Sequence, residues 1–217
     1  MAQVNTKDFS TLPVGRLGLI PLQSCSSLGA KVNDWLVKWR AERQYPGMDS
    51  FAFEGYKRDS YIIDAKTPRF GSGEGKCTIN ESVRGDDIYV MVDVTNYSLS
   101  YPIGPYTNLM SPDDHFQDMK RVIAAVGGKA RRVNVIMPYL YESRQDKRVG
   151  RESLDCANAL HELIDMGVEN IITLMHMIPV YRMRLLFMVL RLYSHPTSSS
   201  RLFLIMKRDF ISTRIIS

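Results

Sequence analysis

The sequence predicts an α/β domain with a mainly parallel sheet flanked by helices. Short apolar strand patterns alternate with helical patterns up to residue 173, which is typical of an open α/β sheet. Val133 to Tyr139 is an apolar run with valine, isoleucine and tyrosine, as in a strand that is covered on both faces. At 217 residues, the chain is long enough for one good-sized core or two small ones.

The chain begins with a predicted strand, Leu17 to Leu22, and a helix. One face of this helix is expected to hold Val32, Trp35, Leu36 and Trp39. Ser24, Ser26 and Ser27 are candidate N-caps, since a serine hydroxyl can accept from free amides of the first turn. The following segment, Ala41 to Thr67, has weak patterning and is predicted to be an insertion loop.

A glycine-containing loop and two strands come next. Tyr61 to Ile63 is expected to form a short strand, and Phe70 to Gly75 alternates glycines with polar residues. Glycines permit close backbone approach to a ligand, but the spacing matches neither common phosphate loop. Lys76 to Asn80 and Asp87 to Val94 are predicted strands, and Thr95 to Met110 a polar loop.

The second helix has clear start and stop signals. Ser111 is the expected cap, Pro112 suits the first position, and acidic residues follow at the positive end of the helix dipole. Gly127 and Gly128 end the helix. Its expected buried residues are Phe116, Met119, Val122, Ile123 and Val126.

Basic residues crowd between the strand at Val133–Tyr139 and the helix that follows, which ends near Met166 before a last strand at 168–173. These residues are Arg144, Lys147, Arg148 and Arg151. Open α/β sheets bind ligands where strands end and helices begin, and guanidinium groups suit a polyphosphate. The alternative is a solvated turn with scattered ion pairs.

Composition places the chain in the soluble globular class, with 24% charged residues. Cys25, Cys77 and Cys156 are far apart and odd in number, which favours free thiols in a reducing cytoplasm. Met1 to Ser10 lacks the apolar core of a signal peptide, and no apolar run reaches membrane-spanning length. We therefore expect a cytoplasmic protein without a membrane partner.

Positive charge is concentrated at the C-terminal end. Residues 1–173 contain 21 basic and 22 acidic residues, a net charge of −1, whereas residues 174–217 contain 7 and 1, a net charge of +6. A basic tail can indicate a nucleic-acid or membrane partner. Its abrupt onset has another explanation, given below, and we expect no nucleic-acid binding.

Two motifs resemble a known family. ESVRG at Glu81–Gly85, and RQDK at Arg144–Lys147 with Arg151-Glu152 behind it, resemble ribose-phosphate pyrophosphokinase. The resemblance runs roughly from Gly18 to Thr173 and implies a phosphoribosyltransferase-like fold. The implied activity is transfer of the terminal diphosphate of MgATP to ribose 5-phosphate. The Ala41–Thr67 insertion indicates a divergent branch.

The resemblance also implies which residues bind ATP. In the family, a loop matching residues 70–74 reaches the nucleotide of a neighbouring subunit, which implies a homo-oligomer, and its phenylalanine stacks on adenine. Ser72 departs from the family's aspartate or asparagine, and Arg144 matches the phosphate ligand. The implied ATP-binding residues are Phe70, Ser72, Gly73, Glu74, Arg144, Gln145 and Asp146; no catalytic or metal-binding residue is assigned.

The sequence after Thr173 is expected to be an out-of-frame copy. If Leu174 to Arg184 is written in allowed codons, one T is restored in front and the bases are regrouped, the translation becomes FDAHDPRVQNA. That segment suits the family after Ile171-Ile172-Thr173 and contains its metal-ligand histidine. We therefore predict an N-terminal domain over 1–173 and an out-of-frame tail over 174–217, with the second catalytic domain missing.

Two functions remain open at this point. The first is a truncated ribose-phosphate pyrophosphokinase, related to enzymes that use ATP and Mg²⁺ but inactive alone. It would lack the loop that binds ribose 5-phosphate and the metal histidine. The second is a noncatalytic nucleotide-binding or regulatory partner of full-length subunits.

Overall fold

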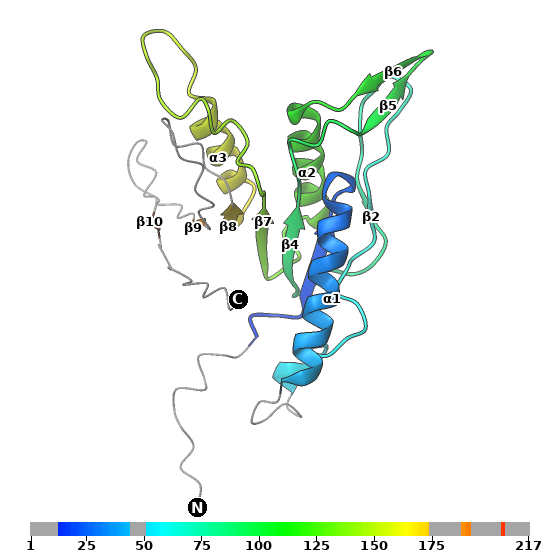
Figure 1. Ribbon diagram of the computed structural model, residues 1–217. Helices are drawn as coiled ribbons and strands as arrows, with labels where there is room; N and C mark the ends of the chain where they lie inside the picture. Colours follow the sequence, from blue (N-terminus) through cyan, green and yellow to red (C-terminus); the bar gives the residue numbers. More distant parts are fainter. Residues whose placement is uncertain (1–12, 44–50, 174–187, 192–204, 207–217) are drawn as a thin grey trace, which may run out of the picture.

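A computed structural model describes residues 13–43, 51–173, 188–191 and 205–206. Figure 1 shows the chain order of the elements. They are β1 (Leu17–Pro21), η2 (Gln23–Cys25), α1 (Ser26–Glu42), η3 (Phe51–Phe53), β2 (Ala65–Lys66), β3 (Thr78–Ile79), β4 (Asp87–Met91), β5 (Ser100–Ile103), β6 (Tyr106–Leu109), α2 (Pro112–Val126), β7 (Arg132–Ile136), α3 (Asp155–Asp165), β8 (Val168–Thr173), β9 (Met188–Arg191) and β10 (Ile205–Met206).

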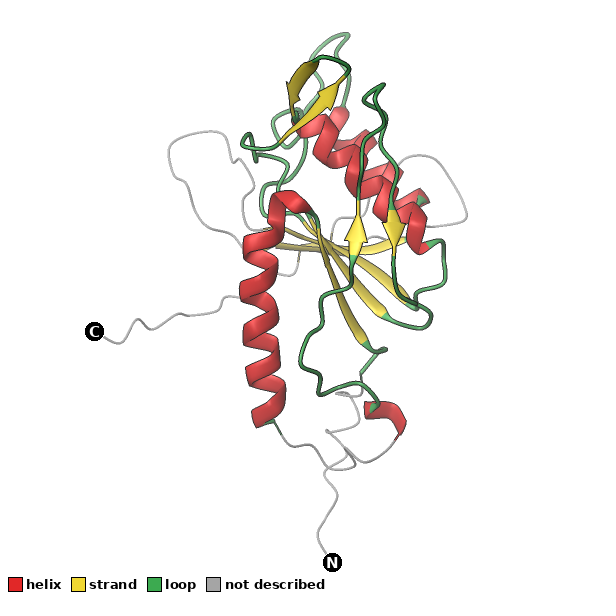
Figure 2. Ribbon diagram, turned by 90° about the vertical axis from the view of Figure 1, so that its right-hand side faces the viewer, coloured by secondary structure: helices red, strands yellow, loops and turns green. Residues whose placement is uncertain are grey.

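The central sheet has the order β1-β4-β7-β8-β9-β10. The pairs β1–β4, β4–β7 and β7–β8 are parallel, and β9 and β10 continue the sheet in antiparallel pairs. α1 covers one face of the sheet, and α2 and α3 cover the other (Figure 2). The predicted α/β class with a mainly parallel sheet is confirmed.

The sheet is buried on both faces, and apolar residues of β1, β4 and β7 make the contacts with the helices. Ile88, Val90 and Val135 are fully buried in the larger core, where α2 and α3 pack. On the other face, Leu17 and Leu19 pack against the inner side of α1. Continuous apolar strands require such cover on both sides, since each face would otherwise expose alternate side chains to water.

The predicted start and stop of α2 are confirmed. The Ser111 hydroxyl accepts from the Asp114 amide at 3.1 Å, and the Asp114 carboxylate accepts from the Ser111 amide at 3.0 Å. This reciprocal pair is a capping box. Gly127 ends the helix in the left-handed conformation, with φ of 59°.

Two expectations for α1 are wrong. Trp35 and Trp39 stand half exposed, at 53% and 50%, while Val32 and Leu36 alone of the four predicted residues pack against the smaller core. Gly29 lies directly against Pro21 and Asn33 is also buried, so the side of the helix that contacts the sheet does not include the two tryptophans. The predicted serine caps also fail: Cys25 is the N-cap and no side chain caps the first turn.

The segment after α1, predicted as an insertion loop over Ala41–Thr67, contains η3, β2 and a short strand-like stretch beside β1. Leu19 donates to Tyr61 O at 2.7 Å, and Ile63 donates to Leu19 O at 2.8 Å. Tyr61 is fully buried. The predicted strand at Tyr61–Ile63 is therefore present as a single parallel bridge at the sheet edge.

The predicted polar loop over Thr95–Met110 instead contains the hairpin β5–β6. Its strands pair from Ser100↔Leu109 to Ile103↔Tyr106, around a turn at Gly104. Pro102 is compatible with this strand because the hairpin is a separate two-stranded sheet with free edges. In β5, partly buried Tyr101 and Ile103 alternate with exposed Ser100 and Pro102, but the proline argues against a strand in so short a run, and β6 is exposed throughout.

Much of the predicted tail lies outside the described residues. This includes the whole segment Leu174–Arg184, whose codons were regrouped. Within the described part, β9 pairs with β8 from Thr173↔Met188 to Asn170↔Arg191. No described helix has both the length and the apolar character needed to cross a membrane.

Candidate functional site

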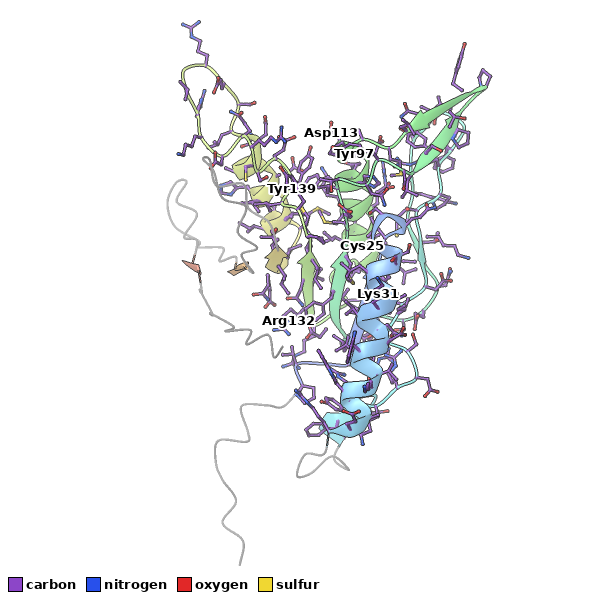
Figure 3. The ribbon with its side chains drawn as sticks, in the orientation of Figure 1. Cys25, Lys31, Tyr97, Asp113, Arg132 and Tyr139 are labelled. Atoms are coloured by element: carbon purple, nitrogen blue, oxygen red, sulfur yellow. The ribbon has the colours of Figure 1, made fainter. Side chains whose placement is uncertain are left out.

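A cavity of about 510 Å³ lies beyond the carboxyl ends of β4 and β7. Figure 3 shows Tyr97, Asp113 and Tyr139 grouped at this end of the sheet, and Arg132 at the opposite end. Ligands of open α/β sheets bind at the carboxyl edge. The cavity is lined by Val94, Thr95, Tyr97, Pro112, Tyr139, Tyr141, Glu142, Ser143 and Arg144.

Ser143 is the most unusual polar residue in this lining. It is 2% exposed, and its hydroxyl has no hydrogen-bond partner within the described part of the chain. The preceding residue, Glu142, adopts φ of 55°, a left-handed conformation uncommon for a side chain of its kind. Buried hydroxyls are normally satisfied, so an unpaired one next to an uncommon backbone conformation marks this part of the cavity wall as unusual.

Tyr141 forms one wall of the cavity. Its ring stacks on Phe116 with centroids 4.2 Å apart, and its hydroxyl donates to Asp113 Oδ1 at 2.6 Å. Burial and this bond to Asp113 raise the pKa of Tyr141, which therefore stays a hydrogen-bond donor at neutral pH. Burial, with the charges of Asp155 and Asp113, also raises the pKa of Glu142.

Arg144 opens the basic loop at the cavity mouth. Its guanidinium is exposed and makes no hydrogen bond or ion pair with the described residues. Lys147, Arg148 and Arg151 are exposed on the same loop. Unpaired cations at a strand end leave their donors available for an anion.

Gln145 and Asp146 are placed differently from Arg144, because neither lines the cavity. The Gln145 amide donates to the carbonyls of Lys147 and Ser153, at 3.2 and 2.9 Å, and so braces the loop from inside. Asp146 is exposed on the loop. Only one of the three predicted residues in this segment therefore faces the cavity directly.

The other predicted ligands lie on a long hairpin, residues 64–80, which we call the arm. β2 and β3 form its base, and Arg69↔Gly75 is a further antiparallel bridge near its tip. Side chains alternate along it: odd-numbered residues such as Ala65 and Cys77 face the core, and even-numbered residues face solvent. This is the ordinary period of a strand.

The tip of the arm is residues 70–74, and it is tightly closed. Phe70 donates to Glu74 O at 2.7 Å, and Gly73 donates to Phe70 O at 2.9 Å. Phe70 is 52% exposed, and the Ser72 hydroxyl donates to Glu74 Oε2 at 2.8 Å. Phe70, Ser72 and Glu74 face outwards, whereas Gly73 has φ of 90° and faces Ile103.

The two groups of predicted ligands do not meet within one chain. The tip packs on the β5–β6 hairpin, where Gly104 donates to Gly71 O at 3.2 Å. In Figure 1 this hairpin rises on one side of the molecule, and the loop between β7 and α3 rises on the other. No residue of the tip lines the cavity that contains Arg144.

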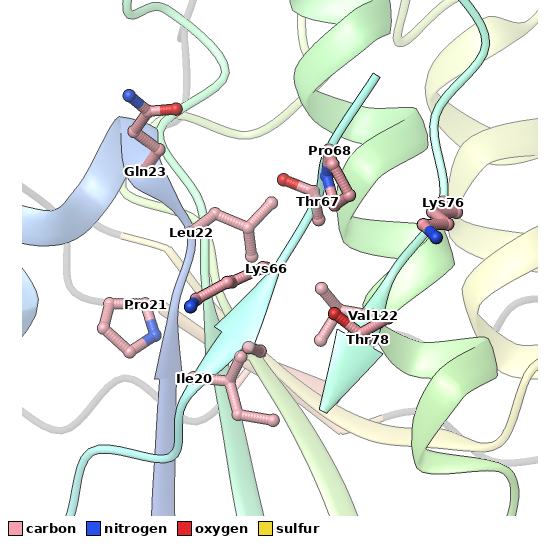
Figure 4. Close-up of a pocket in the computed structure, with 11 residues that line it drawn as sticks. Ile20, Pro21, Leu22, Gln23, Lys66, Thr67, Pro68, Lys76, Thr78 and Val122 are labelled. Carbon is pink, nitrogen blue, oxygen red and sulfur yellow. The ribbon is translucent and has the colours of Figure 1, made fainter. Parts of the chain in front are cut away.

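A second cavity, of about 550 Å³, lies between the end of β1, the base of the arm and α2. Figure 4 shows its apolar floor, including Ile20, Leu22 and Val122. Lys66 and Lys76 reach it from the two strands of the arm. None of the seven predicted ligands lines it.

Comparison with known proteins identifies a family that contains this geometry. Residues 17–167 match the model of the N-terminal domain of ribose phosphate pyrophosphokinase. The chain belongs to this family. The matched region contains both the arm and the cavity, so the resemblance inferred from the two motifs is confirmed.

Curated members of the family align with about half of the chain. A putative ribose-phosphate pyrophosphokinase 2 of Streptococcus mutans is 33% identical over 108 residues, which are 49% of this chain and 29% of that protein. The ribose-phosphate pyrophosphokinase of Bacillus caldolyticus is 31% identical over 108 residues, 49% of this chain and 30% of that protein. The alignments thus span less than a third of these relatives.

A solved structure supports the fold. The phosphoribosylpyrophosphate synthetase of Mycobacterium smegmatis superposes with a TM-score of 0.52 at 21% identity, covering 73% of this chain and 42% of that one. The fold is therefore that of a phosphoribosyltransferase-type domain, as predicted.

Sequence reasoning missed several lining residues of the cavity. Tyr97 lies in the segment predicted as a loop, and Tyr139 lies at the end of a predicted strand. Ser143 stands beside Arg144, but nothing in a single serine signals that its hydroxyl is buried and unpaired. The signal available in the sequence was the position of a residue just after a predicted strand, and this signal pointed to Arg144.

Proposed function

We propose that this chain binds MgATP as the N-terminal domain of a ribose-phosphate pyrophosphokinase. The observation that carries the proposal is Arg144, an unpaired guanidinium at the mouth of a cavity at the carboxyl edge of the sheet. The remaining cations of the loop add positive potential for a triphosphate. Tyr141, whose hydroxyl donates to Asp113, supplies a polar group in the cavity wall.

Magnesium would enter this site with the nucleotide. Among the described residues no group of three or more His, Cys, Asp or Glu is arranged to hold a metal ion. Mg²⁺ commonly keeps several waters and binds substrate phosphates with one or two carboxylates. Asp113 and Glu142, beside the cavity, are the carboxylates that fit this role, and the ion would neutralise phosphate charge there.

The tip of the arm is proposed to complete the site of a second copy. Phe70, Ser72 and Glu74 face outwards and away from their own cavity, and an exposed phenylalanine suits stacking on a base. This placement favours a homo-oligomer formed by the N-terminal domain. Gly73, Gln145 and Asp146 complete the proposed ATP-binding set, with Gly73 shaping the tip and Gln145 bracing the basic loop.

In the complete enzyme, the reaction is proposed to be diphosphate transfer from MgATP to ribose 5-phosphate. Residues 1–173 supply the nucleotide-binding half, and residues 174–217 are proposed to be an out-of-frame tail. This chain alone is then inactive, because bound nucleotide has no sugar hydroxyl aligned against it. A second candidate is a nucleotide-binding regulator, which the outward-facing tip favours because it could enter the site of a full-length subunit.

A titration of ATP and magnesium into the chain and its Arg144→Ala variant tests the binding site. Loss of one charge-assisted phosphate contact is expected to weaken binding by about 1.5–3 kcal/mol. Arg131→Ala is a matched control, since Arg131 is exposed just before β7, away from the cavity. Equal affinity of all three proteins would remove Arg144 from the site.

A mixing experiment tests whether the site is shared. Phe70→Ala and Arg144→Ala each damage every site in a uniform oligomer, whereas a mixed pair contains one site with both residues intact. Re-associating the two variants after dissociation is therefore expected to recover part of the ATP binding. If mixing recovers none while each variant still self-associates, the site is not shared between copies.

A further inference from the structure

Four charged side chains and a tyrosine form a network under the tip of the arm. They are Arg69, Asp114, Asp118, Arg121 and Tyr101. The network joins three parts of the chain: the arm, the β5–β6 hairpin and α2. None of its members belongs to the proposed set of ATP ligands.

Arg69 is the centre of this network. Its side chain is 8% exposed, and its Nη2 lies 2.8 Å from Asp118 Oδ2 and 3.8 Å from Asp114 Oδ1. Nη1 donates to the carbonyl of Gly73 at 3.5 Å, inside the tip. The guanidinium also lies over the Tyr101 ring, 4.6 Å from its centroid.

Asp118 holds two arginines at once. Arg121 Nη1 lies 2.5 Å from Asp118 Oδ1, so each carboxylate oxygen has its own guanidinium. Burial raises the pKa of the Asp118 carboxyl, and the charges of Arg69 and Arg121 oppose this by favouring its ionised form. Removing this carboxylate would leave two buried or half-buried cations side by side, which is costly.

Gly75 shows how closely the network supports the arm. A Cβ at this position would stand 2.8 Å from Arg121 Nη1 and 3.1 Å from Arg69 Nη1. Both guanidinium groups therefore lie directly against the backbone opposite Arg69 in the hairpin. The tip lies between Arg69 and Gly75, so the positions of the two guanidinium groups determine where the tip lies.

We propose that Arg69, Asp118 and Arg121 are positioning residues that hold the tip in the shape needed to contact the base of a nucleotide in a second copy. This inference rests on the proposed function. None of these three residues lines the cavity that contains Arg144, so the network sets affinity for the nucleoside part of ATP and leaves affinity for the triphosphate part unchanged. Preorganisation of this kind strengthens binding because the loop need not be ordered on association.

The test compares binding of ATP with binding of inorganic tripolyphosphate, each with magnesium, in the full chain and in Asp118→Asn. ATP affinity is expected to fall about tenfold or more, as for loss of a base-stacking contact, with tripolyphosphate affinity unchanged. Arg121→Gln is a milder second variant if Asp118→Asn folds poorly. Oligomer mass is measured under the same conditions.

Arg132→Gln is the matched control. It breaks another partly buried arginine–aspartate pair, with Arg132 Nη2 at 2.6 Å from Asp87 Oδ2, at the opposite end of the sheet. This variant is expected to keep the unmodified ratio of ATP to tripolyphosphate affinity. If Asp118 only stabilised the fold, Asp118→Asn and Arg132→Gln would change the ratio of ATP to tripolyphosphate affinity in the same way.

Hydrogen exchange provides a second readout. The amides of Phe70 and Gly73 are hydrogen-bonded within the tip, and they are expected to exchange faster in Asp118→Asn and unchanged in Arg132→Gln. If ATP binds the unmodified chain and Asp118→Asn equally well, or both ligands weaken equally, the positioning role is wrong while the proposed function stands. If the unmodified chain binds neither ligand, the proposed function itself fails.

Discussion

At the scale of single residues, burial separates side chains that look alike in the sequence. Arg69 and Arg144 are both arginines near polar segments, yet one is enclosed by two carboxylates and the other is free at a cavity mouth. Sequence position could locate Arg144, because it follows a recognisable strand. It could not locate Arg69, whose partners lie 45 to 49 residues away on a helix, at Asp114 and Asp118.

The three cysteines provide a prediction at this scale. Burial, with the nearby charge of Asp93, raises the pKa of Cys25 to about 11, and burial also raises the pKa of Cys77 and Cys156. Since the thiolate is the reactive form, roughly one Cys25 in a thousand is reactive at pH 8. Native alkylation is expected to label half-buried Cys77 first and Cys25 last.

Mass spectrometry after timed iodoacetamide treatment measures this order. Because the pKa of Cys25 is raised, its native labelling rate should keep increasing from pH 9 towards pH 11, where an ordinary thiol would level off. Labelling in urea controls for access, as all three thiols then react. Native labelling of Cys25 as fast as Cys77 would contradict the prediction.

At the scale of elements, local signals predicted helices and strands well where they agreed with burial. α2 has a cap, a proline, carboxylates and an apolar stripe that all indicate the same boundaries, and these are the boundaries found. α1 has an apolar pattern that includes two tryptophans, but Gly29 brings the helix close to the sheet and leaves Trp35 and Trp39 outside the contact. The sequence did not predict the β5–β6 hairpin, because β5 contains a proline and β6 is exposed throughout.

The caps of the two helices give a prediction at this scale. Ser111→Ala removes the hydroxyl that accepts from Asp114 N, and is expected to destabilise the fold by about 1 kcal/mol. Ser27→Ala is the matched control, since Ser27 is exposed in the first turn of α1 and no side chain caps that helix. Urea unfolding measures both. A larger loss for Ser27→Ala would show that the capping assignment is wrong.

At the scale of the whole molecule, the proposed ATP site consists of two parts that face different directions. The cavity at the ends of β4 and β7 holds Arg144, whereas the tip of the arm, with exposed Phe70, packs on the β5–β6 hairpin. The sequence motifs identified both parts through a family resemblance. Only the arrangement in space shows that one chain cannot bring them together.

Activity gives the prediction at this scale. The 217-residue chain is expected to form no phosphoribosyl pyrophosphate from MgATP and ribose 5-phosphate, and the product of a gene with one base restored before the codon of Leu174 is expected to form it. Pre-positioned cations and metal supply several kcal/mol of transition-state stabilisation in such reactions, and the proposed tail lacks them. Turnover by the unrepaired chain would overturn the proposal.

An inactive repaired product has a separate meaning. It would favour the regulatory alternative and direct attention to Ser72, where the family has aspartate or asparagine. Ser72→Asp and Ser72→Asn in the repaired gene then test whether the tip alone accounts for the loss.

The alternation of side chains along the arm limits how this protein can change over evolution. Arg69 faces the core and Phe70 faces solvent only because the hairpin has its present length and pairing. Gain or loss of a single residue in one strand would exchange the two faces, turning the buried guanidinium outwards and the aromatic ring inwards. Length changes between residues 64 and 80 should therefore accumulate in pairs or at the tip, whereas the insertion before Tyr61 is free of this constraint.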